Sequence, residues 1–147
     1  YPRGEIIDRA GTGLGDIENV NKSRLVKDGK DILIAAVGIT LYDALIAADI
    51  LEKRGISAAV ADVRCVRPID SDFMRKGAVD KRAVVSIEDG IVTGGFGQQL
   101  EDVLGVQILK FGYPTEPIEQ GSVEQIKIRY GLDSESIADR VEKYLTK

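Results

Sequence analysis

Residues 31–63, "DILIAAVGITLYDALIAADILEKRGISAAVADV", contain two apolar runs separated by a helical pattern. The first run, residues 31–37, is continuously apolar after its opening aspartate, which is typical of a strand buried on both faces of a sheet. Apolar residues then recur at helical spacing over 41–51, and the second apolar run occupies 57–63. A strand, a helix and a second strand in this order form a right-handed βαβ unit, so the sequence predicts an α/β fold.

Upstream of this unit, residues 23–26 ("SRLV") predict a short strand, which "KDGK" separates from the strand at 31–37. Asp28-Gly29 is a strong signal for a type I′ hairpin turn, because that turn needs a positive φ at both central residues. We therefore expect the first strand to pair antiparallel with the second. Residues 1–21 are rich in glycine and charge and keep no apolar period, so they are expected to be a linker or an extended arm.

The same alternation continues downstream. A short helix is predicted after Asp70 and Ser71, a strand at 83–87, a helix after Gly97 and a strand at 106–109. The result is a three-layer α/β/α domain around a mixed five-stranded sheet, with four parallel strands and one antiparallel strand at or near an edge.

Capping residues indicate where several helices begin and end. Thr40, with Asp43 three residues on, predicts the start of the first helix, and Gly55 predicts its end. The same signals bound two helices near the end of the chain: Ser122 with Gln125 begins one that Gly131 ends, and Asp133 or Ser134 begins the last. We expect both of these helices to pack on the sheet.

Composition excludes several classes of function. The chain has 147 residues, a net charge of −4 and a pI near 5.0, which fits one acidic domain and argues against nucleic-acid binding. No stretch approaches the ~20 apolar residues of a membrane span, and the start lacks the apolar segment of a secretory signal. We therefore expect a cytoplasmic protein without nucleic-acid or membrane partners. Because the chain begins with Tyr1, we also expect it to be part of a longer protein.

Histidine is absent, and Cys65 is the single cysteine. Ser-His-Asp and Cys-His catalysis are therefore excluded, as are the usual zinc-ligand spacings and an internal disulfide. Cys65 is interpreted as a small packed side chain, because no histidine can activate its thiol.

A glycine-rich turn, Gly94, Gly95 and Gly97, follows the strand at 83–87 and precedes a helix. This order can present backbone N–H groups to an anion. However, the spacing is GGxG rather than GxGxxG, and no P-loop lysine follows. We favour a packing role, in which glycine allows the helix to lie close to the sheet.

Charged residues follow two of the predicted strands. Glu88 and Asp89 lie at the carboxyl end of one, where open α/β sheets place their ligands, although they could equally be solvated loop carboxylates. Arg64 and Arg67 follow the preceding strand and could bind a carboxylate or phosphate. An ion pair with a neighbouring subunit or domain explains these arginines equally well.

Taken in order, six stretches of the chain resemble one family: "YPRG" (1–4), "DILIAAVGIT" (31–40) with the helix after it, "ADVRCVRPID" (61–70), "VSIEDGIVTGGFGQQL" (85–100), "GYPTEPIEQGS" (112–122) and "YGLDSESIADRV" (130–141). They look like the C-terminal domain of the 1-deoxy-D-xylulose-5-phosphate synthases, which belong to the transketolase-like family that uses thiamine diphosphate. The resemblance covers nearly the whole chain and implies a transketolase C-terminal-domain-like fold. Residues 1–21 would then be the end of a preceding pyrimidine-binding domain and a linker, and residues 22–147 the C-terminal domain.

The resemblance also implies an activity and its cofactors. The parent enzyme would be a transferase that condenses pyruvate with glyceraldehyde 3-phosphate, releases CO₂ and supplies isoprenoid precursors. Thiamine diphosphate and Mg²⁺ would be bound by the preceding domains, in the same chain or in a separate subunit. This chain would bind neither of them. A homodimer is implied as well. We therefore expect no catalytic residue here, no metal site and no activity of the chain alone.

One substrate contact is implied. In the family, the stretch that ends the pyrimidine-binding domain reads Arg-Tyr-Pro-Arg-Gly, and one of its arginines contacts the phosphate of glyceraldehyde 3-phosphate. This chain keeps Tyr-Pro-Arg-Gly, so the resemblance implies that Arg3 binds the phosphate. The planar guanidinium fork is suited to phosphate oxygens.

Two alternatives stay open at this point. The chain could come from another enzyme of the superfamily, such as a 2-oxoacid dehydrogenase β subunit or one half of a split transketolase. It could also be a separate regulatory or interaction module that binds an anion or a partner at the carboxyl ends of the strands, near Arg64, Arg67 and Glu88.

Overall fold

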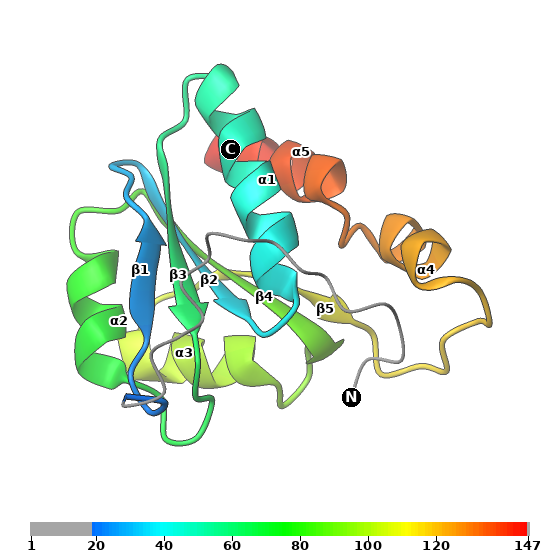
Figure 1. Ribbon diagram of the computed structural model, residues 1–147, viewed down its shortest axis with the longest axis horizontal. Helices are drawn as coiled ribbons and strands as arrows, with labels where there is room; N and C mark the ends of the chain where they lie inside the picture. Colours follow the sequence, from blue (N-terminus) through cyan, green and yellow to red (C-terminus); the bar gives the residue numbers. More distant parts are fainter. Residues whose placement is uncertain (1–18, 147) are drawn as a thin grey trace.

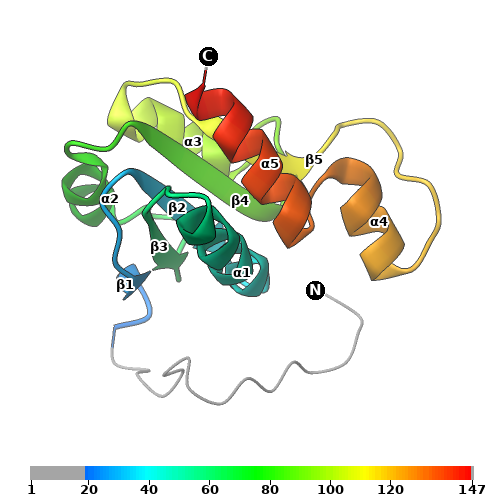
Figure 2. The ribbon, with the colours of Figure 1, turned by 90° about the horizontal axis from the view of Figure 1, so that it is seen from above.

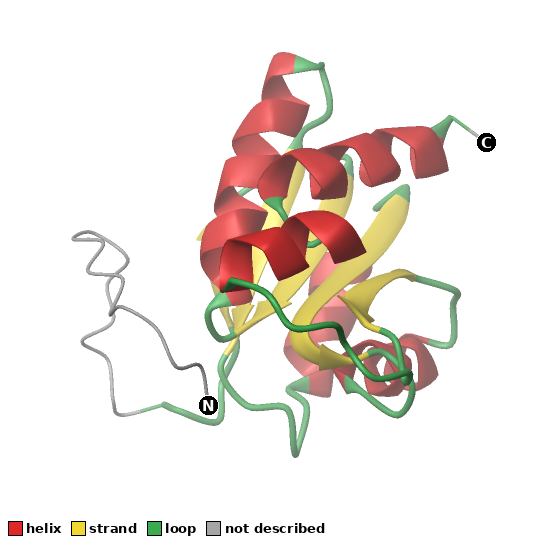
Figure 3. Cartoon of the chain, turned by 90° about the vertical axis from the view of Figure 1, so that its right-hand side faces the viewer, coloured by secondary structure: helices red, strands yellow, loops and turns green. Residues whose placement is uncertain are grey.

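The computed structural model describes residues 19–146 as a five-stranded sheet with helices on both sides (Figures 1 and 3). In chain order the elements are β1 (Arg24–Lys27), β2 (Ile32–Val37), α1 (Thr40–Lys53), β3 (Ala58–Val63), α2 (Ser71–Ala78), β4 (Ala83–Ile91), α3 (Phe96–Leu104), β5 (Leu109–Tyr113), α4 (Val123–Tyr130) and α5 (Ser134–Leu145).

The strands lie in the order β1-β3-β2-β4-β5. β1 runs antiparallel to β3, and every other pair is parallel. β2 is the central strand and is buried over its first five residues. The predicted fold class is therefore confirmed: four parallel strands and one antiparallel edge strand form the middle layer of three.

The three inner strands, β2, β3 and β4, contribute alternate side chains to two separate cores. Ile32 and Ile34 of β2 pack with α1 and α5 on one face of the sheet, whereas Leu33 and Ala35 pack with α2 and α3 on the other. The continuous apolar run of β2 is explained by this burial on both faces. Within residues 19–146, no helix is long and apolar enough to cross a membrane.

α4 differs from the other helices because none of its residues is buried. Together with the loop before it, α4 extends beyond the edge strand β5 (Figure 2). Two contacts hold it. Lys127 forms an ion pair of 2.5 Å with Asp43 of α1, and the ring of Tyr130 meets that of Tyr113 edge to face, with the centroids 5.7 Å apart.

The predicted hairpin is wrong. β1 is antiparallel, as expected, but it pairs with β3 because β3 and β4 occupy both edges of β2. Gly29 does not adopt a positive φ, so the turn is not type I′. Glycine is required at position 29 for a different reason: a Cβ there would overlap the backbone of Ala58 and Ala59 at the start of β3.

Two further boundaries differ from the prediction. The strand expected at 106–109 lies at Leu109–Tyr113, and Val106 is exposed before it. Thr40 does not cap α1, whose N-cap is Ile39 without a side-chain bond. Instead the buried Thr40 hydroxyl accepts a bond from the Val37 N–H and lies within hydrogen-bond distance of the carbonyl oxygens of Val37 and Ile87, at the ends of β2 and β4.

The helix predicted after Gly97 begins slightly earlier, at Phe96, and the capping residues predicted for α2, α4 and α5 are confirmed. Asp70 caps α2 and Asp133 caps α5 through their side chains, and Ser122 forms the complete capping box with Gln125 at the start of α4. Gly55 and Gly131 have positive φ at the ends of α1 and α4. Capping residues therefore predicted helix ends correctly where the capping side chain bonds to the backbone of the helix that it begins.

We predict that Gly29→Ala lowers the free energy of unfolding by about 3 kcal/mol, because the added methyl group must displace backbone rather than a flexible side chain. Urea denaturation measures the change. Gly121→Ala is the matched control: its Cβ would meet only ordinary contacts from 3.5 Å, and its φ is not positive. Equal stability of the two variants would contradict the close approach at Gly29.

Candidate functional site

The ends of β2 and β4 define the topological switch point of the sheet. From β2 the chain passes through α1 to β3 on one side, and from β4 it passes through α3 to β5 on the other. Because the two connections diverge, a crevice forms between the carboxyl ends of these neighbouring strands, and open α/β sheets bind ligands in such crevices.

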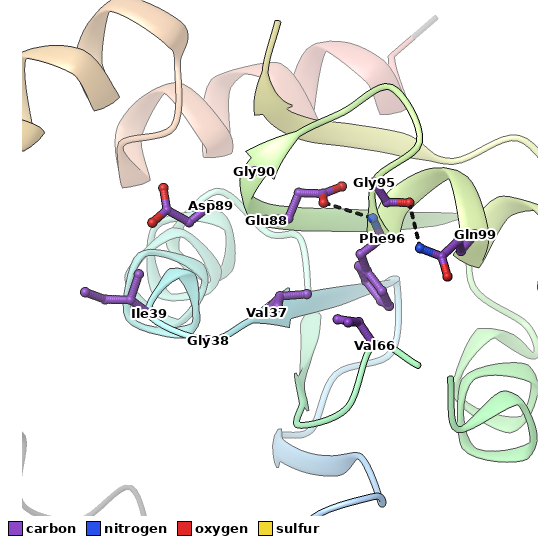
Figure 4. Close-up of a pocket in the computed structure, with 10 residues that line it drawn as sticks. All are labelled: Val37, Gly38, Ile39, Val66, Glu88, Asp89, Gly90, Gly95, Phe96 and Gln99. Carbon is purple, nitrogen blue, oxygen red and sulfur yellow. Dashed lines mark hydrogen bonds between the residues drawn. The ribbon is translucent and has the colours of Figure 1, made fainter. Parts of the chain in front are cut away.

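A cavity of about 590 Å³ lies at this point (Figure 4). Its walls are residues 37–39 at the end of β2 and just beyond it, residues 88–90 at the end of β4, the first turn of α3, and Val66 from the loop after β3. We call it the switch-point pocket. Val37, Ile39, Val66 and Phe96 make most of the lining apolar, and Asp89 and Gln99 supply polar groups.

Glu88 is a buried charged residue in the lining of the pocket. This side chain is buried, and its two carboxylate oxygens accept hydrogen bonds from the backbone N–H groups of Phe96 (2.9 Å) and Gly97 (3.0 Å). A carboxylate at a helix N-terminus is stabilised by the helix dipole and satisfies N–H groups that have no partner within the helix. The protein's own carboxylate therefore occupies the anion position that the glycine-rich turn creates.

The glycines of the turn have separate structural causes. A Cβ on Gly95 would overlap the Glu88 carboxylate, and a Cβ on Gly97 would overlap the Ser86 hydroxyl. Gly94 has a φ of +73° with open space around it, so it is needed for its backbone conformation. The turn thus brings α3 close enough to β4 for Glu88 to reach the helix.

The two arginines of the loop after β3 bind different parts of the domain. Arg67 donates through Nε to Gln99 Oε1 (3.2 Å) and so reaches the rim of the switch-point pocket. Arg64 donates to the carbonyl oxygen of Asn19 (3.2 Å), on the segment that leads into β1. The half-buried Cys65 points its sulfur toward the carbonyl of Arg67.

Arg3 lies outside the described residues. Its assignment therefore stays a prediction, as does the domain boundary after residue 21. Within residues 19–146, no three His, Cys, Asp or Glu side chains lie close enough together to hold a metal ion.

The sequence did not indicate a polar cluster beside the pocket. Asp89 lies near Tyr113, the last residue of β5, and interacts electrostatically with its hydroxyl group. The pKa of Tyr113 is raised, chiefly by burial and then by the charge and hydrogen bond of Asp89, with a smaller effect of Asp43. Adjacent positions on β4 thus differ in role: Glu88 faces α3, and Asp89 faces β5.

We predict that Glu88→Gln lowers the free energy of unfolding by about 2 kcal/mol, because the amide keeps one acceptor and turns an N–H group toward a backbone donor. Urea denaturation at pH 7 is the measurement. Glu116→Gln, at an exposed loop position, is the control and should change stability little. An unchanged midpoint for Glu88→Gln would show that its two hydrogen bonds do not stabilise the turn.

A second prediction concerns pH. The pKa of Tyr113 is raised in the folded state, so the protonated phenol contributes to the free energy of unfolding. This contribution is fully present below the ordinary tyrosine pKa of about 10 and is lost as pH rises through the raised value. Asp89→Asn should lower the pKa of Tyr113, measured as a shift in the phenolate absorbance titration. Asp102→Asn, on an exposed face of α3, should leave the curve in place. Superimposable curves for wild type and Asp89→Asn would contradict the contact.

Comparison with known proteins agrees with this fold. Residues 21–137 match the family described as transketolase, C-terminal domain. A 1-deoxy-D-xylulose-5-phosphate synthase of Syntrophotalea carbinolica is 37% identical over 99% of this chain, which corresponds to 24% of that protein. The 1-deoxy-D-xylulose-5-phosphate synthase 1 of Geobacter metallireducens is 31% identical, again over 99% of this chain and 24% of its own length. The chain thus spans about a quarter of the length of these curated relatives.

Solved structures show the same architecture. A split-gene transketolase, described as an inactive β4 tetramer, superposes with a TM-score of 0.80 at 32% identity and covers 86% of this chain and 43% of its own. A Pichia stipitis transketolase reaches a TM-score of 0.68 at 20% identity over 87% of this chain and 18% of its own, which shows the fold alone. The resemblance expected from the sequence is confirmed, and the chain belongs to the transketolase C-terminal domain family.

Proposed function

We propose that this chain is the C-terminal domain of a 1-deoxy-D-xylulose-5-phosphate synthase, a transferase that joins pyruvate and glyceraldehyde 3-phosphate with release of CO₂, for isoprenoid precursor synthesis. The observation that carries the proposal is the match of nearly the whole chain to about a quarter of such synthases. The enzyme is proposed to be a cytoplasmic homodimer.

The chain's role in this enzyme is architectural. It contains no histidine, and its buried carboxylate at the switch point, Glu88, caps α3. We therefore assign the catalytic groups to the preceding domains, which are also proposed to hold thiamine diphosphate and Mg²⁺. When bound there, thiamine diphosphate supplies the nucleophilic carbon and the electron sink for decarboxylation. The domain described here would stabilise the subunit and its interfaces.

Arg3 is the residue of this chain proposed to touch substrate. Its guanidinium would donate two parallel hydrogen bonds to the phosphate of glyceraldehyde 3-phosphate. Loss of a charge-assisted pair of this kind costs about 1.5–3 kcal/mol, or roughly 10- to 100-fold in affinity.

A separate subunit of a split transketolase is the second candidate, because the split-gene transketolase is similar in both structure and sequence, with a TM-score of 0.80 and 32% identity. A substrate panel on the complete enzyme separates the two: transketolases use ketose phosphate donors, whereas the proposed enzyme uses pyruvate. An anion-binding module is disfavoured, because Glu88 occupies the N-terminus of α3.

The test uses the full-length polypeptide with thiamine diphosphate and Mg²⁺. We expect CO₂ release from pyruvate that depends on glyceraldehyde 3-phosphate, and no turnover by residues 1–147 alone. Arg3→Ala should raise the KM for glyceraldehyde 3-phosphate by about 10-fold or more and leave the KM for pyruvate in place. Arg9→Ala, in the same segment, is the matched control.

Turnover of ketose phosphates without use of pyruvate would refute the synthase assignment. Equal KM values for the Arg3 and Arg9 variants would refute the phosphate contact alone.

A further inference from the structure

Residues 116–130 leave the body of the domain between two fixed points, and we call them the flap. Before the flap, the Thr115 hydroxyl lies 3.3 Å from the hydroxyl of Thr93, in the loop after β4. After it, Leu132 is buried in the core that α1 and α5 share. Between these points the chain forms a loop and then α4, which extend beyond the edge strand β5 (Figure 2).

The flap buries little apolar surface. None of its residues is buried, and residues 116–125 form a continuous exposed run. Its aliphatic side chains Ile118, Val123 and Ile128 are 40%, 59% and 61% exposed. Packing of an apolar face on the rest of the protein supplies most of the stability of a helix in a folded domain. The flap therefore draws little stability from this source.

Two contacts join the flap to the rest of the domain. The Lys127 ammonium lies 2.5 Å from the Asp43 carboxylate of α1, and the two side chains are 20% and 18% exposed. The Tyr130 ring meets the Tyr113 ring of β5 edge to face. An ion pair that opens regains its hydration, and the rings supply one aromatic contact. Together they form a weak latch.

The flap is well organised internally. Ser122 and Gln125 form the capping box of α4, Arg129 pairs with Glu119, and Gly131 ends the helix in the left-handed conformation. These contacts bind the flap to itself and not to the domain. Because α4 has only eight residues, and isolated helices below about 12–15 residues are marginal in water, it needs the latch to stay helical. Release of α4 should therefore melt it and expose its amide groups.

We propose that the flap is a conformational device: it opens as one unit, by release of the Lys127–Asp43 and Tyr130–Tyr113 contacts, while the sheet and the other helices stay folded. Opening uncovers the Asp43 carboxylate at the start of α1 and the Tyr113 ring. Tyr113 also lies near Asp89, in the lining of the switch-point pocket, so the closed flap holds one neighbour of the pocket in place. This property belongs to the domain in whichever enzyme contains it.

The test measures amide hydrogen exchange in the full-length polypeptide by mass spectrometry, with each rate divided by its intrinsic rate. Peptides from α4 are compared with peptides from α5, in which Ile137, Ala138 and Val141 are buried. We expect the helical amides of α4 to exchange at least about 100-fold faster than those of α5, because local opening costs much less free energy than global unfolding. Equal protection of the two helices would show that they open together and would overturn the proposal.

A variant of the latch tests the cause of the opening. Lys127→Ala removes the ion pair and keeps a good helix former. It should speed exchange in α4 by about 3- to 10-fold and leave α5 unchanged. Ile128→Ala, at the next position of the same helix, removes a side chain that is 61% exposed and should not speed exchange. Faster exchange in both helices after Lys127→Ala, or in neither, would overturn the proposal.

A second variant distinguishes opening of the whole flap from fraying of the helix end. Tyr130→Leu removes the ring contact, and fragmentation of the labelled peptides resolves single amides. If the flap opens as one unit, the amides of Ile126 and Arg129 should speed up by the same factor, although only Arg129 adjoins the changed side chain. A change confined to Arg129 would indicate fraying of the last turn and would overturn the proposal.

Discussion

Burial of β2 on both faces is the constraint on which the other layers depend. Residues 32–36 are entirely withdrawn from solvent, so each face of this strand needs its own layer of helices. Side chains alternate along a strand, and the two cores are therefore separate clusters that meet only through the sheet. With β3 on one side of β2 and β4 on the other, the connections diverge, and the switch-point pocket follows from this divergence.

The sequence predicted the layers but not the partner of the first strand. Asp28-Gly29 carries a local signal for a hairpin, and that signal was overridden because β2 has no free edge. The glycine is needed for a contact with β3, a segment about thirty residues away, which no local pattern could indicate. The last strand was predicted at 106–109, a few residues before the observed β5. The apolar residues of "VQIL" favoured that position, whereas the alternation of Leu109, Phe111 and Tyr113, which a half-buried strand requires, marks the true one.

The site was partly visible in the sequence. Glu88 and the glycine-rich turn were each noted, yet their relation depends on the angle at which α3 leaves β4. A carboxylate that lies eight residues before Phe96 reaches its N–H only in that geometry. The pairs Asp89–Tyr113 and Asp43–Lys127 join residues that are far apart in sequence, and each is formed by packing rather than by periodicity.

The pairing of β1 with β3 also has a consequence for the pocket. Had β1 formed the expected hairpin with β2 on the side that β4 now occupies, β2 and β4 would no longer be neighbours, and their ends could not both line one crevice. Because β1 lies beyond β3, β2 and β4 remain neighbours, and the antiparallel direction of β1 brings the preceding residues to the side of the sheet where the parallel strands end, where Asp70 and Arg64 hold them. The position of β1 is thus compatible with the pocket between β2 and β4, and its direction determines where the preceding residues lie.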